Sequence, residues 1–279
     1  NTVSTYASGT GGAGVFGALY YAWMASVLPP DTIIQITSIV PISCFLIYLI
    51  LLPKGRATSF SWNFLAHCRK QNSPRLHEDE AQPLVVDVVE TDEQLTETVD
   101  QVEPSAMVKL QLIKQVAHLM AALCLVYYFE YLINQALFEF MYFPGNSLNL
   151  DLAAQYRWYQ VLYQVGVFIS RSSVNLFHVR QTWILTLLQG VNFFLLLGHV
   201  LQPFLPALWL AFALVLYEGL LGGLSYVNTF YRISKESPPK YREFILATAS
   251  TADGFGIMLS AFSAILVHNA LCDRIKSGQ

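Results

Sequence analysis

Long apolar segments recur along this chain, and they restrict its fold more than any other feature. Several of them reach about 20 residues, the length that an α-helix needs to cross the hydrocarbon core of a bilayer. Only 13% of the 279 residues are charged, against roughly 25% in an average soluble domain. The sequence therefore predicts an all-α protein, a multi-pass transmembrane helical bundle in contact with the lipid bilayer.

The apolar segments predict about seven spans. They cover residues 15–28, 32–52, 105–142, 155–171, 183–201, 207–231 and 244–271. Lys and Arg occur in the connections after the second, fourth and sixth spans and are missing from those after the first, third and fifth. By the positive-inside rule, the connection 53–108 is then cytosolic and the chain starts on the cytosolic side. Since the chain does not open with Met, we expect it to be incomplete at its N-terminus.

The connection 53–108 differs from the spans in composition. Its first part is basic with aromatic residues interleaved, and it forms either a short helix on the membrane surface or a solvated loop. Its second part is acidic, has few aromatic residues and is predicted to be a disordered linker. Within it, Glu80, Leu84 and Val85 follow a pattern that resembles an acidic dileucine sorting signal, with Val in place of the usual Leu or Ile. This pattern predicts contacts with trafficking adaptors.

Other motifs favour structural explanations. The string Gly9–Gly14 matches the G-x-G-x-x-G of dinucleotide sites, but an apolar run follows it, whereas such a site needs a surrounding βαβ unit. The small residues Gly11, Gly14, Gly17 and Ala18 instead favour close helix packing in lipid. The four cysteines show no paired spacing, so we expect no metal site and no cofactor. No Ser-His-Asp or Cys-His arrangement is present, which argues against an enzyme, and the net charge of −3 gives no indication of a nucleic-acid partner.

Two neighbouring helices each carry one continuous polar face that covers about half of a 3.6-residue helical wheel. In the segment 125–142 the face contains Tyr127, Tyr128, Glu130, Tyr131, Asn134, Gln135, Glu139 and Tyr142. In the segment 155–171 it contains Gln155, Tyr156, Arg157, Tyr159, Gln160, Tyr163, Gln164, Ser170 and Arg171. Glu218 and Tyr226 in the sixth span and Asp253 in the seventh extend the set.

These polar groups have two explanations that the residues leave open. A charge at the bilayer centre costs at least about 2.5 kcal/mol, so the groups should face the bundle interior or a wet cavity. They then either line a path for a solute or protons, or join helices by hydrogen bonds. The path is favoured for Glu130, Asn134 and Glu218, since an amide would join helices at a lower cost than a carboxylate. Arg171, at a cytosolic end, is by default a membrane anchor.

Four sequence blocks resemble the battenin family of lysosomal membrane proteins. They are ASGTGGAG (7–14), YFEYLINQALFE (128–139), QYRWYQVLYQVGVF with SRSS (155–173) and LYEGLLGG with YVNTF (216–230). The resemblance implies a fold similar to the major facilitator and equilibrative nucleoside transporters, with about eleven helices. Residues 1–52 would then hold the last two helices of the N-terminal half, 53–108 the central cytosolic linker, and 109–279 the C-terminal five-helix half.

The resemblance also implies a lysosomal or vacuolar membrane and a link to lysosomal pH, glycerophosphodiester clearance and basic amino-acid handling. Our leading hypothesis is an exporter of a small polar solute that works by alternating access. Its carboxylates would couple transport to protons, and Arg157 and Arg171 would bind an anionic phosphodiester. The alternative is a non-transporting scaffold that regulates lysosomal trafficking and acidification through its cytosolic linker.

Overall fold

The computed structural model describes residues 2–51, 106–173 and 178–277, and helices are the only regular secondary structure in these ranges. The chain divides into two units. One contains α1 (Thr2–Met24) and the helices after the linker, and the other contains α2 (Pro30–Thr37) and α3 (Ile39–Leu51). The linker, with the predicted sorting motif Glu80, Leu84 and Val85, lies outside the described residues.

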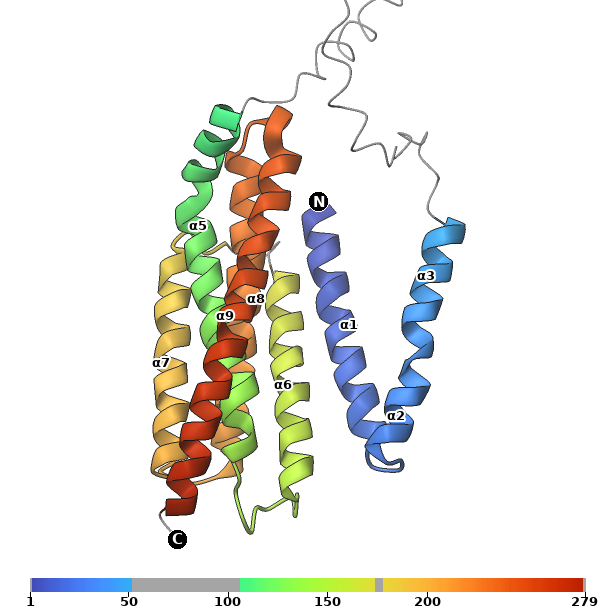
Figure 1. Cartoon of the computed structure of the whole chain (residues 1–279), viewed down its shortest axis with the longest axis vertical. Helices are drawn as coiled ribbons and strands as arrows, with labels where there is room; N and C mark the ends of the chain where they lie inside the picture. Colours follow the sequence, from blue (N-terminus) through green and yellow to red (C-terminus); the bar gives the residue numbers. More distant parts are fainter. Residues whose placement is uncertain (1, 52–105, 174–177, 278–279) are drawn as a thin grey trace, which may run out of the picture. The chain divides into compact units, whose positions relative to one another are not determined.

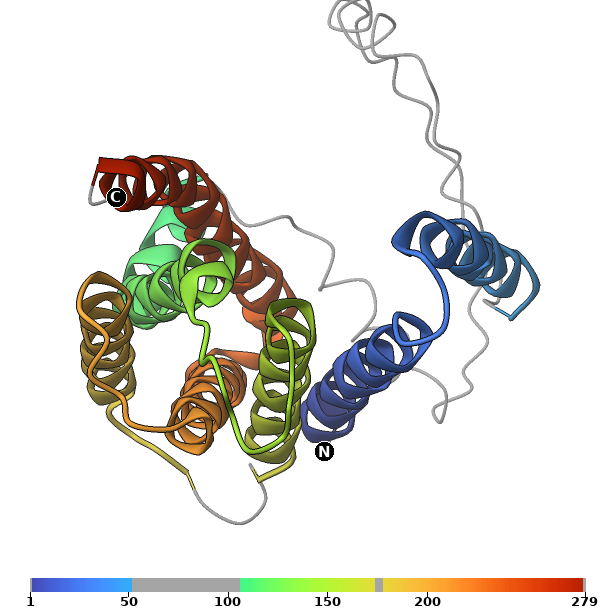
Figure 2. The same cartoon turned by 90° about the horizontal axis from the view of Figure 1, so that it is seen from below.

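The first unit is a helical bundle (Figure 1). After the linker it contains α5 (Ala106–Leu132), η2 (Ile133–Leu137), η3 (Phe138–Phe140), α6 (Leu152–Ser172), α7 (Thr182–Leu201), α8 (Leu208–Glu236), η5 (Pro239–Tyr241) and α9 (Arg242–Ser277). Seen along the bundle, α5, α6, α7 and α8 surround a common centre (Figure 2). α9 packs along α5, and α1 packs along α6.

Five helical segments of the described residues are long and apolar enough to cross a membrane. They are Pro30–Ile50, Ala106–Phe140, Thr182–Leu201, Leu208–Glu236 and Pro239–Arg274. This confirms the predicted multi-pass helical membrane fold. α1, with 23 residues, and α6, with 21, are also long but more polar, and for these two helices a membrane-spanning role stays a prediction.

The outer surface of α6 and α7 is apolar, as expected for helices that face lipid. On α6, Trp158 and Ile169 are exposed, and on α7 Leu187 and Phe194 are exposed. The polar face of α6 points the other way, and its Gln155, Tyr159 and Tyr163 are buried. The helix therefore turns its apolar side outward and its polar side inward.

Glycines bring α6 and α8 into backbone contact. A Cβ added to Gly219 of α8 would overlap the backbone oxygen of Tyr163 and lie 3.0 Å from the backbone nitrogen of Val167. A Cβ added to Gly166 of α6 would overlap the backbone oxygen of Leu216. Such close approach is typical of small residues at helix interfaces in membranes. It holds the middle of α8 firmly against the polar face of α6.

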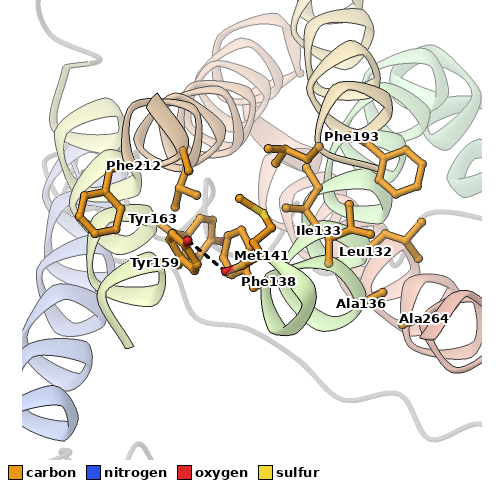
Figure 3. Packing of buried hydrophobic residues seen from close by; sticks show 14 of the residues in the cluster. Leu132, Ile133, Ala136, Phe138, Met141, Tyr159, Tyr163, Phe193, Phe212 and Ala264 are labelled. Atoms are coloured by element: carbon orange, nitrogen blue, oxygen red, sulfur yellow. Dashed lines mark hydrogen bonds between the residues drawn. The ribbon is translucent and has the colours of Figure 1, made fainter. Parts of the chain in front are cut away.

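The predicted helix 105–142 differs from the structure at its C-terminal end. The α-helix ends at Leu132, a π-helical turn covers Ile133–Leu137, and a 3₁₀ turn ends at Phe140. Hydrophobic periodicity gave no sign of this change, because a π-helical turn inserts one residue without altering the residue types. The turn lies against a core of large side chains that includes Phe138, Met141 and Phe193 (Figure 3).

Candidate functional site

Two carboxylates, Glu130 of α5 and Glu218 of α8, lie inside the bundle with 1% and 0% of their surface exposed. The side-chain nitrogen Nδ2 of Asn134 donates a hydrogen bond to Oε1 of Glu218 at 3.0 Å and another to the backbone oxygen of Glu130 at 3.1 Å. The hydroxyl of Tyr163 donates to Oε1 of Glu130. We refer to Glu130, Asn134, Tyr163 and Glu218 as the carboxylate cluster.

Gly222 makes room for the carboxylate cluster. It lies one turn after Glu218 on α8, and a Cβ added there would overlap the carboxyl group of Glu130. The second oxygen, Oε2, of both Glu130 and Glu218 is buried and has no hydrogen-bond partner among the described residues. Buried carboxylates that lack full hydrogen bonding are costly to fold, which favours a functional role for the cluster over helix association alone.

A pocket of about 390 Å³ borders this cluster. It is lined by Tyr131, Asn134, Gln135, Tyr156, Gln160, Tyr163 and Gln164. All seven belong to the two polar faces that the sequence predicts, three from the segment 131–135 and four from α6. Asn134 and Tyr163 belong to both the lining and the cluster, so these two side chains separate the pocket from the buried carboxylates. Its lining offers amide and hydroxyl groups, which suit a polar solute.

Arg171 lies in a cage of three neutral side chains near the end of α6. Its Nη1 donates to the hydroxyl of Thr10 in α1, and its Nη2 donates to the hydroxyl of Tyr127 in α5, both at 3.0 Å. Its guanidinium carbon is 4.2 Å from the ring centroid of Tyr226 in α8. The residue therefore joins four helices within the bundle, and its Nε is buried without a hydrogen-bond partner in the described residues.

Two of the predicted path residues, Gln155 and Tyr159, form hydrogen bonds to backbone groups. The side chain of Gln155 accepts from the backbone nitrogen of Phe143 at 3.0 Å and donates to the backbone oxygens of Phe143 and Leu150 at 3.1 and 2.9 Å. The hydroxyl of Tyr159 donates to the backbone oxygen of Met141 at 3.2 Å (Figure 3). Both residues are fully buried, and they fix the turn between η3 and α6.

The remaining candidates lie outside the cluster. Glu139 is exposed and faces His268, with 3.7 Å between Oε2 and Nδ1. Arg157 is half-buried near the start of α6. Asp253 of α9 is half-buried, and its Oδ1 has no partner within the described ranges. Within those ranges, no three His, Cys, Asp or Glu side chains come together as metal ligands would.

Sequence reasoning missed several buried polar residues. Thr10 was not considered as a partner of Arg171, and Gln189 and Asn192 of α7 were passed over although they are 0% and 2% exposed. Neither amide has a hydrogen-bond partner among the described residues. The sequence does carry a signal for these two residues, because an amide in an otherwise apolar span needs a hydrogen-bond partner or water.

Together, the apolar outer surface, the spanning helices and the buried polar interior define a multi-pass α-helical membrane protein. The family model of the CLN3 protein matches residues 1–274, and the chain belongs to this family. This confirms the resemblance found from the sequence blocks.

Relatives extend along nearly the whole chain. It is 40% identical to battenin of Canis lupus familiaris over 97% of this chain and 58% of battenin. It is 36% identical to protein BTN1 of Eremothecium gossypii over 98% of this chain and 68% of that protein, and 33% identical to protein BTN1 of Saccharomyces cerevisiae over 97% and 67%. The chain thus spans about three fifths to two thirds of the length of these relatives. No solved structure matches it.

Proposed function

We propose that this chain forms part of a solute transporter that exports a small polar solute from the lysosome or vacuole. The observation that carries the proposal is the pocket of about 390 Å³ with a purely amide and hydroxyl-bearing lining, which borders two buried carboxylates. A helix junction of this kind near the middle of a bundle is where secondary transporters bind their substrates. Membership in the CLN3 family and the relation to battenin support the lysosomal or vacuolar location.

The proposed solute is glycerophosphodiester-like. The amides of Gln135, Gln160 and Gln164 would donate to its phosphate oxygens, and the hydroxyls of Tyr131 and Tyr156 would bind its glycerol hydroxyls. A site built from neutral donors holds an anion weakly enough to release it. An arginine in direct bidentate contact with the anion would hold it more tightly. Arg171 would contribute positive charge from its cage rather than a direct contact.

The carboxylate cluster would couple this movement to protons. Glu130 and Glu218 lie close together inside the bundle, bridged by Asn134. Keeping both carboxylates negatively charged in this buried place is energetically costly. Binding a proton on either carboxylate removes that cost, and release of the proton restores it. A change in proton occupancy can then favour one orientation of the solute pocket over the other. This supports a role for the protein in lysosomal pH as well as in solute export.

The test is counterflow in proteoliposomes that contain the full-length protein. We expect exchange of glycerophosphodiesters to exceed exchange of basic amino acids. In a second assay, net export driven by a proton gradient, we expect Glu130→Gln to abolish the dependence of flux on pH, while the matched control Glu139→Gln, which changes an exposed carboxylate, leaves it intact. Equal flux with wild-type and Glu130→Gln protein at every pH would remove Glu130 from the mechanism.

The alternative function, a scaffold acting through the linker, predicts a different outcome. Deleting residues 78–103 would then abolish adaptor binding and alter lysosomal acidification, and counterflow would be absent in the wild type. Normal counterflow in this deletion variant, together with loss of the pH dependence of flux in Glu130→Gln, supports the transporter.

A further inference from the structure

A row of buried polar side chains extends the carboxylate cluster toward one end of the bundle. It consists of Thr182 and Gln189 of α7 and Ser225 and Thr229 of α8, and we refer to these four residues as the polar file. Each has no more than 1% of its surface exposed. None of their side-chain oxygen or nitrogen atoms has a hydrogen-bond partner among the described residues. All four lie in segments long and apolar enough to span the membrane.

On α8 the file continues from the carboxylate cluster. Glu218, Gly222, Ser225 and Thr229 follow one another at intervals of four, three and four residues, so they share one stripe of the helix. Gly222 meets the carboxyl group of Glu130 on α5. The whole stripe, including Ser225 and Thr229, therefore borders α5 inside the bundle.

On α7 the file borders the same helix. Thr182, Thr186, Gln189 and Phe193 again follow at intervals of four, three and four. Thr186 donates to the backbone oxygen of Ala122 in α5 at 3.1 Å, and the rings of Phe193 and Phe129 are 5.7 Å apart. Because Gln189 lies between these two contacts on one stripe, its amide also faces the interior beside α5.

The two halves of the file meet at one level of the bundle. The backbone nitrogen of Val179, just before α7, donates to Oδ1 of Asn228 in α8 at 2.8 Å, which places Thr182 and Thr229 near the same end. From Thr229 back to Glu218 the stripe covers eleven residues of α8, or about 16 Å at the usual helical rise. A second pocket of about 360 Å³ lies at this end, lined by His178, Val179, Arg180, Tyr231, Arg232, Lys235 and Glu236.

Unpartnered hydroxyls and amides are expensive in the interior of a membrane protein, where lipid offers no hydrogen bonds. Five such atoms in one file cannot all remain unpaired in a stable bundle. Internal water is the usual partner of buried polar groups that find none in the protein, and a buried water makes about three hydrogen bonds. We propose that the polar file holds a chain of internal water molecules, and that this chain conducts protons between Glu218 and the end of the bundle near Val179.

This inference rests on the proposed function and separates the routes of its two cargoes. The solute would reach the cluster through the pocket lined by Asn134 and Tyr163, and protons would reach it through the file. A proton enters as hydronium, and each water or hydroxyl along the file accepts one proton and passes one on. Protonated Glu218 is the product, and no water or hydroxyl changes its net protonation.

The charged and titratable groups near Glu218 come from the surrounding helices. Glu130 is contributed by α5, and Tyr163 by α6, where the more distant Arg171 interacts electrostatically with Glu130. Asp253 of α9 interacts electrostatically with Tyr127 of α5. The stripe of α7 contributes only the neutral Thr182, Thr186 and Gln189. Glu218 and Glu130 are thus the groups that the file can supply with protons.

The first test measures water in the file without any transport. Ser225→Cys and Thr229→Cys are placed in the full-length protein after its native cysteines have been replaced, and the proteins are labelled in membranes with 2-aminoethyl methanethiosulfonate. We expect both to react at least tenfold faster than Val215→Cys, a fully buried position of α8 in the apolar core. Reaction at the rate of Val215→Cys would show a dry interior and overturn the inference.

The second test uses Gln189→Leu, which removes the amide and keeps an apolar side chain of similar length. We expect proton-driven net flux to fall at least tenfold and solute counterflow, which needs no net proton movement, to change less than twofold. An equal fall in both would place Gln189 in the solute path or the scaffold and overturn the proton role. If the wild type carries no solute at all, the proposed function fails, and the labelling rates still decide whether the file is hydrated.

Discussion

The polar face of α6 makes two kinds of contact, and of the residues in its first part Tyr156 shares the pocket with the second part. In its first part, Gln155 and Tyr159 donate hydrogen bonds to backbone oxygens of Met141, Phe143 and Leu150. In its second part, Tyr163 binds a buried carboxylate, and the neighbouring Gln160 and Gln164 open onto a pocket. Both parts carry Gln and Tyr side chains, so the residue types alone do not distinguish them. The two parts differ in the segment of the chain that each of them faces.

The end of the preceding helix explains this difference. Since α5 gives way to a π-helical turn and η3 stops at Phe140, the backbone groups that follow have no helical partner and need side chains. The first part of α6 lies beside them and supplies those side chains. The second part lies beside intact helices, whose backbone groups are already paired. Its polar groups are therefore left for a carboxylate, a solute or water.

The largest expected effect comes from separating α6 from α8. Gly219→Val would force a side chain into the backbone of Tyr163 and Val167, so we expect a loss of more than about 3 kcal/mol of stability, since overpacking at a backbone contact has no flexible side chain to yield. Thermal unfolding of the full-length protein in detergent measures it. Gly254→Val is the control, because no atom lies within 4 Å of a Cβ added at Gly254. Equal melting temperatures would contradict the close contact.

The first part of the polar face is tested by Gln155→Leu. The change removes three hydrogen bonds to the turn and leaves buried backbone groups unpaired, which should cost about 2–3 kcal/mol. We expect a lower melting temperature in detergent but unchanged solute flux per folded molecule, because Gln155 does not line the pocket.

The matched variant in the second part is Gln160→Leu. Here we expect the reverse result, with little change in melting temperature and a fall of at least tenfold in flux. If both variants lost stability and flux to the same extent, the division of the polar face into a structural and a pocket-lining part would be wrong.

The sequence was sufficient to predict which helix faces are polar, but not which groups each polar side chain contacts. The 3.6-residue period placed Glu130 and Asn134 on one face and Tyr163 on another, and the structure brings these residues together with Glu218. It could not show that Gln155 would meet the backbone of Phe143, because that depends on where η3 stops. The space at Gly222 for a carboxyl group was equally hidden, since it depends on how α5 and α8 pack.

The caged arginine also illustrates this limit. A basic residue at the end of a helix is expected at the membrane surface, yet Arg171 bonds to Thr10 and Tyr127 and stacks on Tyr226. Only the fold supplies these partners, which come from three different helices. The 3.6-residue spacing of polar residues along α6 carries no information about these partners on other helices.

An intermediate effect is expected from Arg171→Lys. Lysine keeps the charge but cannot donate to Thr10 and Tyr127 in the same fixed geometry or stack flat on Tyr226, so we expect a loss of about 1–2 kcal/mol. Thermal unfolding measures it, and Arg157→Lys, at a half-buried position near the start of α6, is the control. A larger loss in the control would show that the cage contributes little.

The smallest effect is expected from Glu139→Gln, on the same predicted polar face as Glu130. The side chains of Glu139 and His268 are 56% and 36% exposed, and Oε2 of Glu139 is 3.7 Å from Nδ1 of His268. Exposed ion pairs contribute less than about 1 kcal/mol because water screens them. We therefore expect an unchanged melting temperature and unchanged flux at each pH in proteoliposomes. A loss of the pH dependence of flux as complete as that expected for Glu130→Gln would extend the carboxylate path to Glu139. Burial would then be a poor guide to which carboxylates of this face carry protons.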